Sequence, residues 1–159
     1  MKRLIDFFVL LVAVAVVAGT LRAQTPSFVG TWKLNLAKSK YAGSPAPKSL
    51  TRTVTADDPG LKYSFEGEAA DGSKISFGFT SKLDGSDSAV SGVGMPGGAD
   101  TVALEKTSAH RIGGVLKKGG AKIGTVTTVI SYDGKTVTVN TKAKIDGKDV
   151  KTQQLYEKQ

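Results

Sequence analysis

Cysteine is absent from the 159 residues, and histidine occurs once, at His110. Without cysteine the chain has no disulfide framework, no cysteine-based zinc module, no thiol nucleophile and no lipid-modified N-terminal cysteine. A single histidine also excludes a multi-histidine metal centre within one chain. We therefore expect no metal and no cofactor.

Patterns typical of catalysis are missing as well. No Gly-x-Ser-x-Gly elbow precedes a helix, and no serine or threonine lies in a recognisable context with a histidine base. Of the acidic pairs, Asp57-Asp58 falls in an expected turn, and Glu66 and Glu68 fall on an expected solvated strand face. We expect a protein that is not an enzyme.

Aromatic residues make up only 7% of the chain, whereas glycine occurs 19 times. This composition, with many threonines and valines, favours short strands and tight turns over a helical bundle. Beyond residue 23 the only arginines are Arg52 and Arg111, so the clustered arginines and stacking aromatics of a nucleic-acid site are missing. We expect no nucleic-acid partner.

The one long apolar run lies at the N-terminus. Lys2 and Arg3 precede an apolar segment over 7–19, and Leu21-Arg22-Ala23 offers a cleavage site. The run is shorter than the roughly 20 residues of a membrane-spanning helix. The pattern predicts a signal peptide over 1–23, followed by one domain over 24–159 that is periplasmic or extracellular, with no transmembrane segment after cleavage. An uncleaved N-terminal anchor is the alternative.

Turn signals divide the rest of the chain into strands. Asp-Gly pairs at 71–72, 84–85, 133–134 and 146–147 supply the positive φ of hairpin turns, Gly119-Gly120 makes a fifth turn, and 95–98 is a looser connection. The expected strands cover 28–36, 49–56, 61–68, 74–82, 87–93, 101–107, 111–117, 122–132, 136–145 and 150–157. About ten strands with such short connections predict an all-β, antiparallel up-and-down meander that closes into a barrel.

Alternation within the strands assigns the inner face of the barrel. The aromatic inner face of two neighbouring strands, formed by Tyr63, Phe65, Phe77 and Phe79, either packs a core or lines a ligand cavity. Arg52 also points inward, where it needs a protein carboxylate or an anion. These five residues are candidate ligand contacts.

The two ends of the domain resemble a known superfamily. The opening strand, with Gly30-Thr31-Trp32, resembles the Gly-x-Trp strand of the calycin superfamily, which includes lipocalins and fatty-acid-binding proteins, and 155–158 resembles the closing strand of the latter. Residues 30–47 are also similar to the opening of small exported bacterial lipocalin-like proteins. The resemblance implies that Gly30 lets the chain turn inward, that Trp32 plugs the closed end and that the last strand pairs with the first.

The chain departs from fatty-acid-binding proteins where they hold a carboxylate. Two arginines do this in that family, and the matching positions here are Gln154, two residues before Tyr156, and Val129, four before Asp133. We therefore expect a small apolar ligand with a neutral or weakly polar group, with Arg52 and Tyr156 as polar anchors beside Gln154.

The segment that holds a helical lid in fatty-acid-binding proteins is short here. Residues 37–48 contain Gly43, Pro45 and Pro47, which leaves room for one helical turn at 37–41 and no lid. The expected function is an exported, monomeric binding protein for a small hydrophobic molecule. The alternative is a packed barrel that acts as an envelope interaction, structural or inhibitor protein.

Overall fold

The computed structural model describes residues 27–159; the predicted signal peptide lies outside them. Nearly all of the described chain is antiparallel strand. The elements are β1 (Gly30–Ala42), β2 (Ser49–Asp57), β3 (Gly60–Glu68), β4 (Lys74–Ser81), β5 (Asp84–Ala89), β6 (Ser91–Val93), the 3-10 segment η1 (Pro96–Gly98), β7 (Thr101–Ser108), β8 (Arg111–Lys118), β9 (Ala121–Ile130), β10 (Thr136–Ile145) and β11 (Lys148–Lys158). No helix among them is long and apolar enough to cross a membrane.

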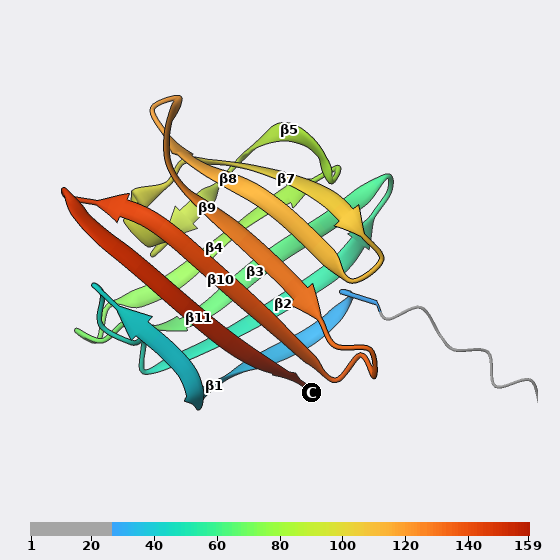
Figure 1. Cartoon of the computed structure of the whole chain (residues 1–159), viewed down its shortest axis with the longest axis horizontal. Coiled ribbons are helices and arrows are strands. Elements are labelled where there is room, and N and C mark those ends of the chain that lie inside the picture. The colour runs from blue at the N-terminus through green and yellow to red at the C-terminus, as the bar shows by residue number, and fades with distance from the viewer. Residues whose placement is uncertain (1–26) are drawn as a thin grey trace, which may run out of the picture.

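The strands form one 11-stranded sheet that curls into a nearly closed barrel. Its order is β5-β7-β8-β9-β10-β11-β1-β2-β3-β4-β6, so the last strand, β11, lies between β10 and the first strand, β1. Figure 1 shows β8–β11 crossing in front of β2–β4, with the interior between the two layers. The predicted antiparallel meander barrel is confirmed, and so is the pairing of the last strand with the first.

Two hairpins have the turn that their dipeptides predict. In the turn between β10 and β11, Asp146 and Gly147 have φ of +49° and +78°, and Ile145 pairs directly with Lys148. Between β8 and β9, Gly119 and Gly120 also both have positive φ and form a two-residue turn. A two-residue turn with both φ positive matches the right-handed twist of the flanking strands.

One predicted strand is wrong in its bounds and partners. Instead of a single strand over 87–93, β5 begins at Asp84 and pairs with β7, while β6 pairs with β4. The Asp84-Gly85 pair therefore begins a strand and does not close a hairpin between β4 and β5. The chain changes from one edge of the sheet to the other between Ala89 and Ser91, and a seam without strand pairing separates β4 from β5.

The predicted helical turn at 37–41 is also wrong, because β1 continues through it. The pairing of β1 with β11 shifts register between Asn35 and Lys40, which is a β-bulge. Side chains hold the extra residues: the Ser39 hydroxyl donates to the Asn35 carbonyl at 2.7 Å, and the Leu155 amide donates to that hydroxyl at 3.0 Å. A bulge satisfies these backbone groups without a helix.

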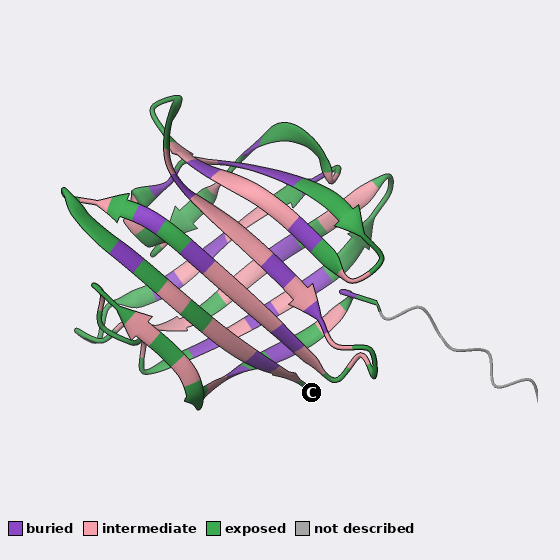
Figure 2. Cartoon of the chain, in the orientation of Figure 1, coloured by how far each residue is buried: buried purple, intermediate pink, exposed green. Residues whose placement is uncertain are grey.

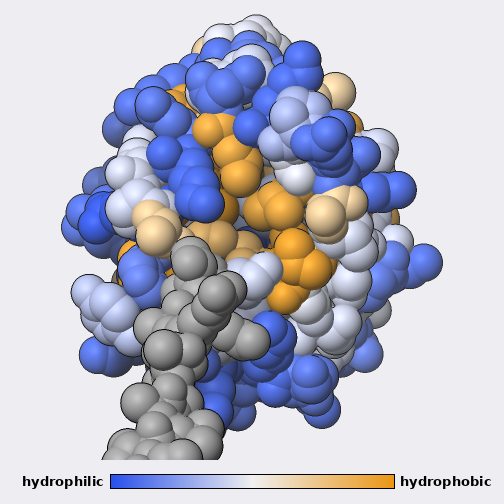
Figure 3. Space-filling view, turned by 90° about the vertical axis from the view of Figure 1, so that its right-hand side faces the viewer, coloured by the Kyte–Doolittle hydropathy of each residue, from blue (hydrophilic) through white to orange (hydrophobic). Residues whose placement is uncertain are grey.

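Buried and exposed residues alternate along most strands, as Figure 2 shows. At the end of the barrel where the described chain begins, Trp32 is fully buried and its indole Nε1 donates to the Phe28 carbonyl at 3.0 Å. Figure 3 shows this end, with apolar residues at its centre and hydrophilic ones around them. Trp32 is thus buried at one end of the barrel.

Candidate ligand-binding cavity

The interior of the barrel holds a cavity of about 310 Å³. Inner-face side chains of β1–β4 and β7–β11 line it, joined by the β1–β2 loop and the segment around η1. The lining residues used below are Tyr41, Ser44, Arg52, Tyr63, Phe65, Ile75, Phe77, Phe79, Met95, Leu116, Thr128, Thr141, Thr152, Gln154 and Tyr156. These residues therefore line a cavity and do not fill a core.

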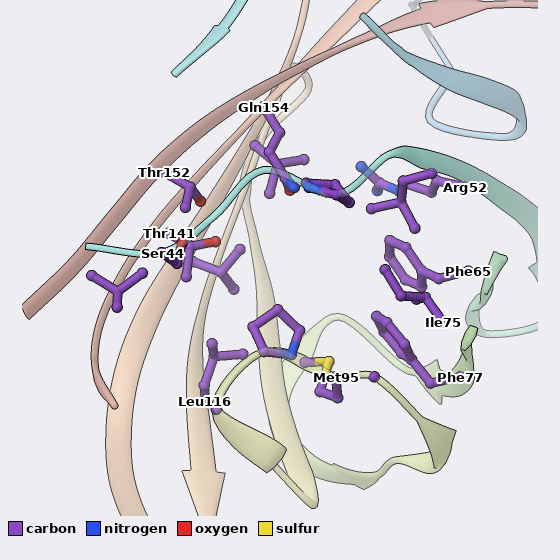
Figure 4. Close-up of a pocket in the computed structure, with 18 of the residues that line it drawn as sticks. Ser44, Arg52, Phe65, Ile75, Phe77, Met95, Leu116, Thr141, Thr152 and Gln154 are labelled. Carbon is purple, nitrogen blue, oxygen red and sulfur yellow. The ribbon is translucent and has the colours of Figure 1, made fainter. Parts of the chain in front are cut away.

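One wall of the cavity is aromatic. Tyr63 and Phe65 on β3 face Phe79 and Phe77 on β4 in direct register. The rings of Tyr63 and Phe79 stack with centroids 4.8 Å apart, and those of Phe65 and Phe77 stack at 4.5 Å. Ile75 extends this wall along β4, as Figure 4 shows. The wall suits the apolar body of a ligand.

Arg52 is the only charged side chain among the lining residues, and it is 2% exposed. It lies on β2, between Trp32 of β1 and Phe65 of β3. Its guanidinium carbon is 5.2 Å from the centroid of the Tyr63 ring, and its Nε is buried without a hydrogen-bond partner. Within residues 27–159 no carboxylate forms an ion pair with it; the three ion pairs there all involve lysines.

Burial lowers the pKa of Arg52 from its ordinary value, and the neighbouring Tyr63 and Tyr156 act in the opposite direction. Burial raises the pKa of both tyrosines, so at neutral pH they are uncharged hydroxyls. The Tyr63 hydroxyl is buried beside Arg52, whose charge and hydrogen bonding lower the Tyr63 pKa less than burial raises it. Arg52, with an unpartnered Nε, and the Tyr63 hydroxyl thus lie together at the cavity wall.

Gln154 is already hydrogen-bonded within the protein. Its amide Nε2 donates to the Tyr41 hydroxyl at 3.2 Å, and its Oε1 accepts from the Tyr156 hydroxyl at 3.2 Å. Burial raises the pKa of Tyr41, while its hydrogen bonds to Gln154 and Ser39 lower it less. The three side chains form a neutral, connected polar group on the wall.

The structure places all seven predicted ligand residues around this one cavity: Arg52, Tyr63, Phe65, Phe77, Phe79, Gln154 and Tyr156. Sequence reasoning did not select Tyr41, because 37–41 was expected to be helical. It also passed over Met95 and Ser44, which lie in loops where alternation carries no signal. Thr128 and Thr152 sit at alternating strand positions, so their inward direction was accessible from the pattern.

The sequence-based placement of Val129 at a ligand-binding position is wrong. Its neighbour Thr128 lines the cavity and is buried, so alternation puts Val129 on the outer face of β9. Counting four residues back from Asp133 misplaced the inner position by one, because the β9–β10 connection is longer than a two-residue turn. Val129 therefore says nothing about the ligand.

Gly30 and Trp32 lie outside the cavity lining. Gly30 has φ of +143°, and a Cβ there would be 3.0 Å from Lys158 Cε, whose ammonium lies 5.2 Å from the centroid of the Trp32 ring. Both residues thus shape the barrel end. No group of metal-ligating side chains large enough to hold an ion occurs in the described part of the chain.

No family model matches the sequence, and a search of curated proteins finds no match. Among solved structures, zebrafish ileal bile acid-binding protein complexed with cholic acid is similar, with a TM-score of 0.50 and 12% identity over 83% of this chain and 98% of that one. The chain has a calycin-type fold. Between β1 and β2, this calycin-type barrel has a short loop through Ser44 and Pro45 in place of a helical lid.

Proposed function

We propose that this protein is an exported, non-enzymatic binding protein that holds one small amphipathic molecule inside its calycin-type barrel. The apolar body of the ligand lies against the aromatic wall, and an acidic group meets Arg52. The N-terminal pattern of Lys2, Arg3 and an apolar run supports export. The cholic acid complex of a protein with this fold supports a barrel-type binder of small molecules.

The observation that carries the proposal is the buried guanidinium of Arg52 at the cavity wall, which forms no ion pair within residues 27–159 and whose Nε has no hydrogen-bond partner there. A buried ion without a partner costs several kcal/mol. A bound carboxylate offsets this cost, because each hydrogen bond to a charged group contributes about 1.5–3 kcal/mol. The Tyr63 hydroxyl beside it supplies a further donor.

An acidic ligand replaces the neutral one that the sequence alone favours. The neutral expectation relied on two uncharged positions, of which Val129 faces outward and Gln154 is engaged by Tyr41 and Tyr156. Arg52 lines the cavity from β2, so the proposed anion site is on a different strand. Arg52 Nε has no hydrogen-bond partner within residues 27–159, and a neutral ligand would leave the guanidinium without a counter-charge.

The test compares dodecanoic acid with dodecanol, which differ in the acidic group alone. We expect the protein to bind the acid at least about tenfold more tightly, or about 1.4 kcal/mol, measured by titration calorimetry at pH 7.5. Arg52→Met removes the charge and should bring the ratio near one. Arg111→Met is the matched control, because Arg111 is exposed on β8. Equal binding of both compounds by the unmodified protein, or no saturable binding, contradicts the proposal.

A further inference from the structure

A short segment of the chain crosses the seam between β4 and β5. This segment, called the strap below, covers residues 91–98 and consists of β6, η1 and the two residues between them. β6 is the last strand in the sheet order and pairs with β4 alone, through three residue pairs that include Ser76 with Val93. Releasing the strap would therefore break one strand pairing and leave the other strands of the barrel joined.

The strap lies at the end of the barrel away from Trp32. Trp32 pairs with Lys158 at one end of β11, whereas Ile145 pairs with Lys148 at the other end. A Cβ at Gly97 would lie 3.2 Å from Ile145 Cγ1, so η1 rests against the far end of β10. The buried tryptophan and the strap thus occupy opposite ends of the barrel.

The middle of the strap forms part of the cavity wall. Residues 94–97 all line the cavity, and Figure 4 shows Met95 between Leu116 and Phe77. Phe77 belongs to the aromatic wall, and its partner on β6 is Gly92. Displacing the strap would therefore open the cavity beside the aromatic wall, at the seam.

Few hydrogen bonds hold the strap to the rest of the barrel beyond its pairing with β4. The Gly98 amide donates to the Met95 carbonyl, which is a bond within the strap itself. Two side-chain bonds join it to other elements: the Ser91 hydroxyl donates to β4 at 3.3 Å, and the Lys118 ammonium donates to η1 at 3.4 Å. Both are long and lie at exposed positions, so they contribute little.

The other connections at this end of the barrel are held more firmly. Between β1 and β2, the Lys48 amide donates to the Glu68 carbonyl at 2.8 Å, and the Lys48 ammonium pairs with the Glu68 carboxylate at 2.6 Å. Between β3 and β4, the Ala69 amide donates to the Ser73 carbonyl at 2.9 Å. The β8–β9 and β10–β11 turns have two residues each. A short, exposed edge strand is the kind of element that opens locally at low cost.

We propose that the strap is the entrance to the cavity: β6 separates from β4, the strap moves away from the seam, and the ligand passes beside Phe77. This inference rests on the proposed function and concerns how the same site is opened and closed. Opening of the strap precedes both entry and exit of the ligand, so it sets the rate constants of both steps. It leaves the affinity unchanged, because the closed complex is the same.

A disulfide between β4 and β6 tests the proposal. Ser76 and Val93 are direct partners, and paired Cα atoms in antiparallel strands lie about 4.5–5.5 Å apart, which suits a disulfide. The chain has no cysteine, so the double variant Ser76→Cys/Val93→Cys can form one disulfide only. The probe is anilinonaphthalene sulfonate, an apolar anion that fluoresces in apolar sites, and stopped-flow fluorescence measures its exchange.

We expect the oxidised double variant to bind and release the probe at least about tenfold more slowly than its reduced form, with a Kd within about threefold. The reduced form is the reference because it carries the same two substitutions. Thr127→Cys/Asn140→Cys is the matched control, since these residues are direct partners on β9 and β10, which stay joined in either state. Its disulfide should change both rate constants less than about twofold.

Gly92→Ala tests the same step in the opposite direction. A Cβ at Gly92 would clash with the Ser76 carbonyl oxygen, so β6 could no longer approach β4. Both rate constants should therefore rise, and unchanged rate constants would contradict the proposal. Circular dichroism verifies that the barrel is retained in each variant.

The outcomes separate the inference from the proposed function. If the unmodified protein binds the probe saturably, but oxidised and reduced Ser76→Cys/Val93→Cys exchange it at the same rates, the ligand enters elsewhere. The inference is then wrong while the proposed function stands. If the unmodified protein binds neither the probe nor dodecanoic acid saturably, the proposed function fails and the inference fails with it.

Discussion

Arg52 is a residue that the folded protein holds at a cost. It is buried beside Trp32, Phe65 and Tyr63, and no carboxylate in the described chain pairs with it. Removing an uncompensated buried charge often stabilises a protein, in contrast to removing one member of an ion pair. A residue that lowers stability while it contributes to binding is typical of a functional site.

We therefore expect Arg52→Met to raise the free energy of unfolding of the ligand-free protein by about 1–2 kcal/mol, measured by urea denaturation. The same substitution at exposed Arg111 should change it by less than about 0.5 kcal/mol. A large loss of stability in Arg52→Met would mean that Arg52 is structural and would contradict its assignment as a ligand anchor.

Residue direction was predictable wherever strands alternate without interruption. Tyr63, Phe65, Phe77 and Arg52 were all placed on the inner face from the pattern, and each lines the cavity. Val129 was misplaced, because a one-residue error in counting across a turn transfers a side chain to the other face of the sheet. That Gln154 is engaged by Tyr41 was beyond the sequence, since their contact joins residues 113 apart.

At the scale of elements, turn chemistry predicted hairpins well and strand partners less well. The two-residue turns at Gly119-Gly120 and Asp146-Gly147 form because both residues of each pair can adopt positive φ, which is a local property of the sequence. The same dipeptide signal failed at Asp84-Gly85, because the seam between β4 and β5 depends on which edges meet when the barrel curls. The bulge in β1 was missed for a similar reason: its hydrogen bonds involve β11, at the other end of the chain.

Gly147→Ala should lower the free energy of unfolding by about 1–2 kcal/mol, because a Cβ is unfavourable at positive φ. No atom lies within 4 Å of the Cβ position there, so the penalty is conformational and not a clash. Gly147→Asn, which tolerates this region better, should lose less. Thermal unfolding followed by circular dichroism measures both, and equal midpoints for Gly147→Ala and the unmodified protein would contradict the turn assignment.

For the whole molecule, the exposed carboxylates of turns and strand ends determine the response to acid. Hydrogen bonds hold the pKa of several of them below the ordinary range: Ser73 acts on Asp71, Ser86 on Asp84, Gly119 and Thr101 on Asp100, Ser131 and Lys135 on Asp133, and Lys38 and Asn35 on Glu157. A lowered pKa in the folded state means that the stabilisation is present above the unfolded pKa, about 4, and is lost as the pH falls through the folded one.

The midpoint of urea denaturation should therefore fall as the pH drops from 5 to 2.5. Replacing four of these carboxylates together (Asp71→Asn, Asp84→Asn, Asp100→Asn and Asp133→Asn) keeps residues that suit turns but removes their titration, and should flatten the dependence. A midpoint in the unmodified protein that is constant or rises toward pH 2.5 is the contrary result.

The position of β11 between β10 and β1 also affects how the chain is made. The sheet is not continuous until the eleven residues of β11 have left the ribosome, so a nascent chain without β11 exposes the free edges of β1 and β10. The two ends of the domain meet, since the Gln159 amide donates to the Thr31 carbonyl at 3.0 Å, while the seam between β4 and β5 lies mid-chain. A circular permutant that joins the old ends and opens at Lys82 should therefore fold to the same barrel and add its strands in spatial order, except for β6, which pairs with β4 at the far edge.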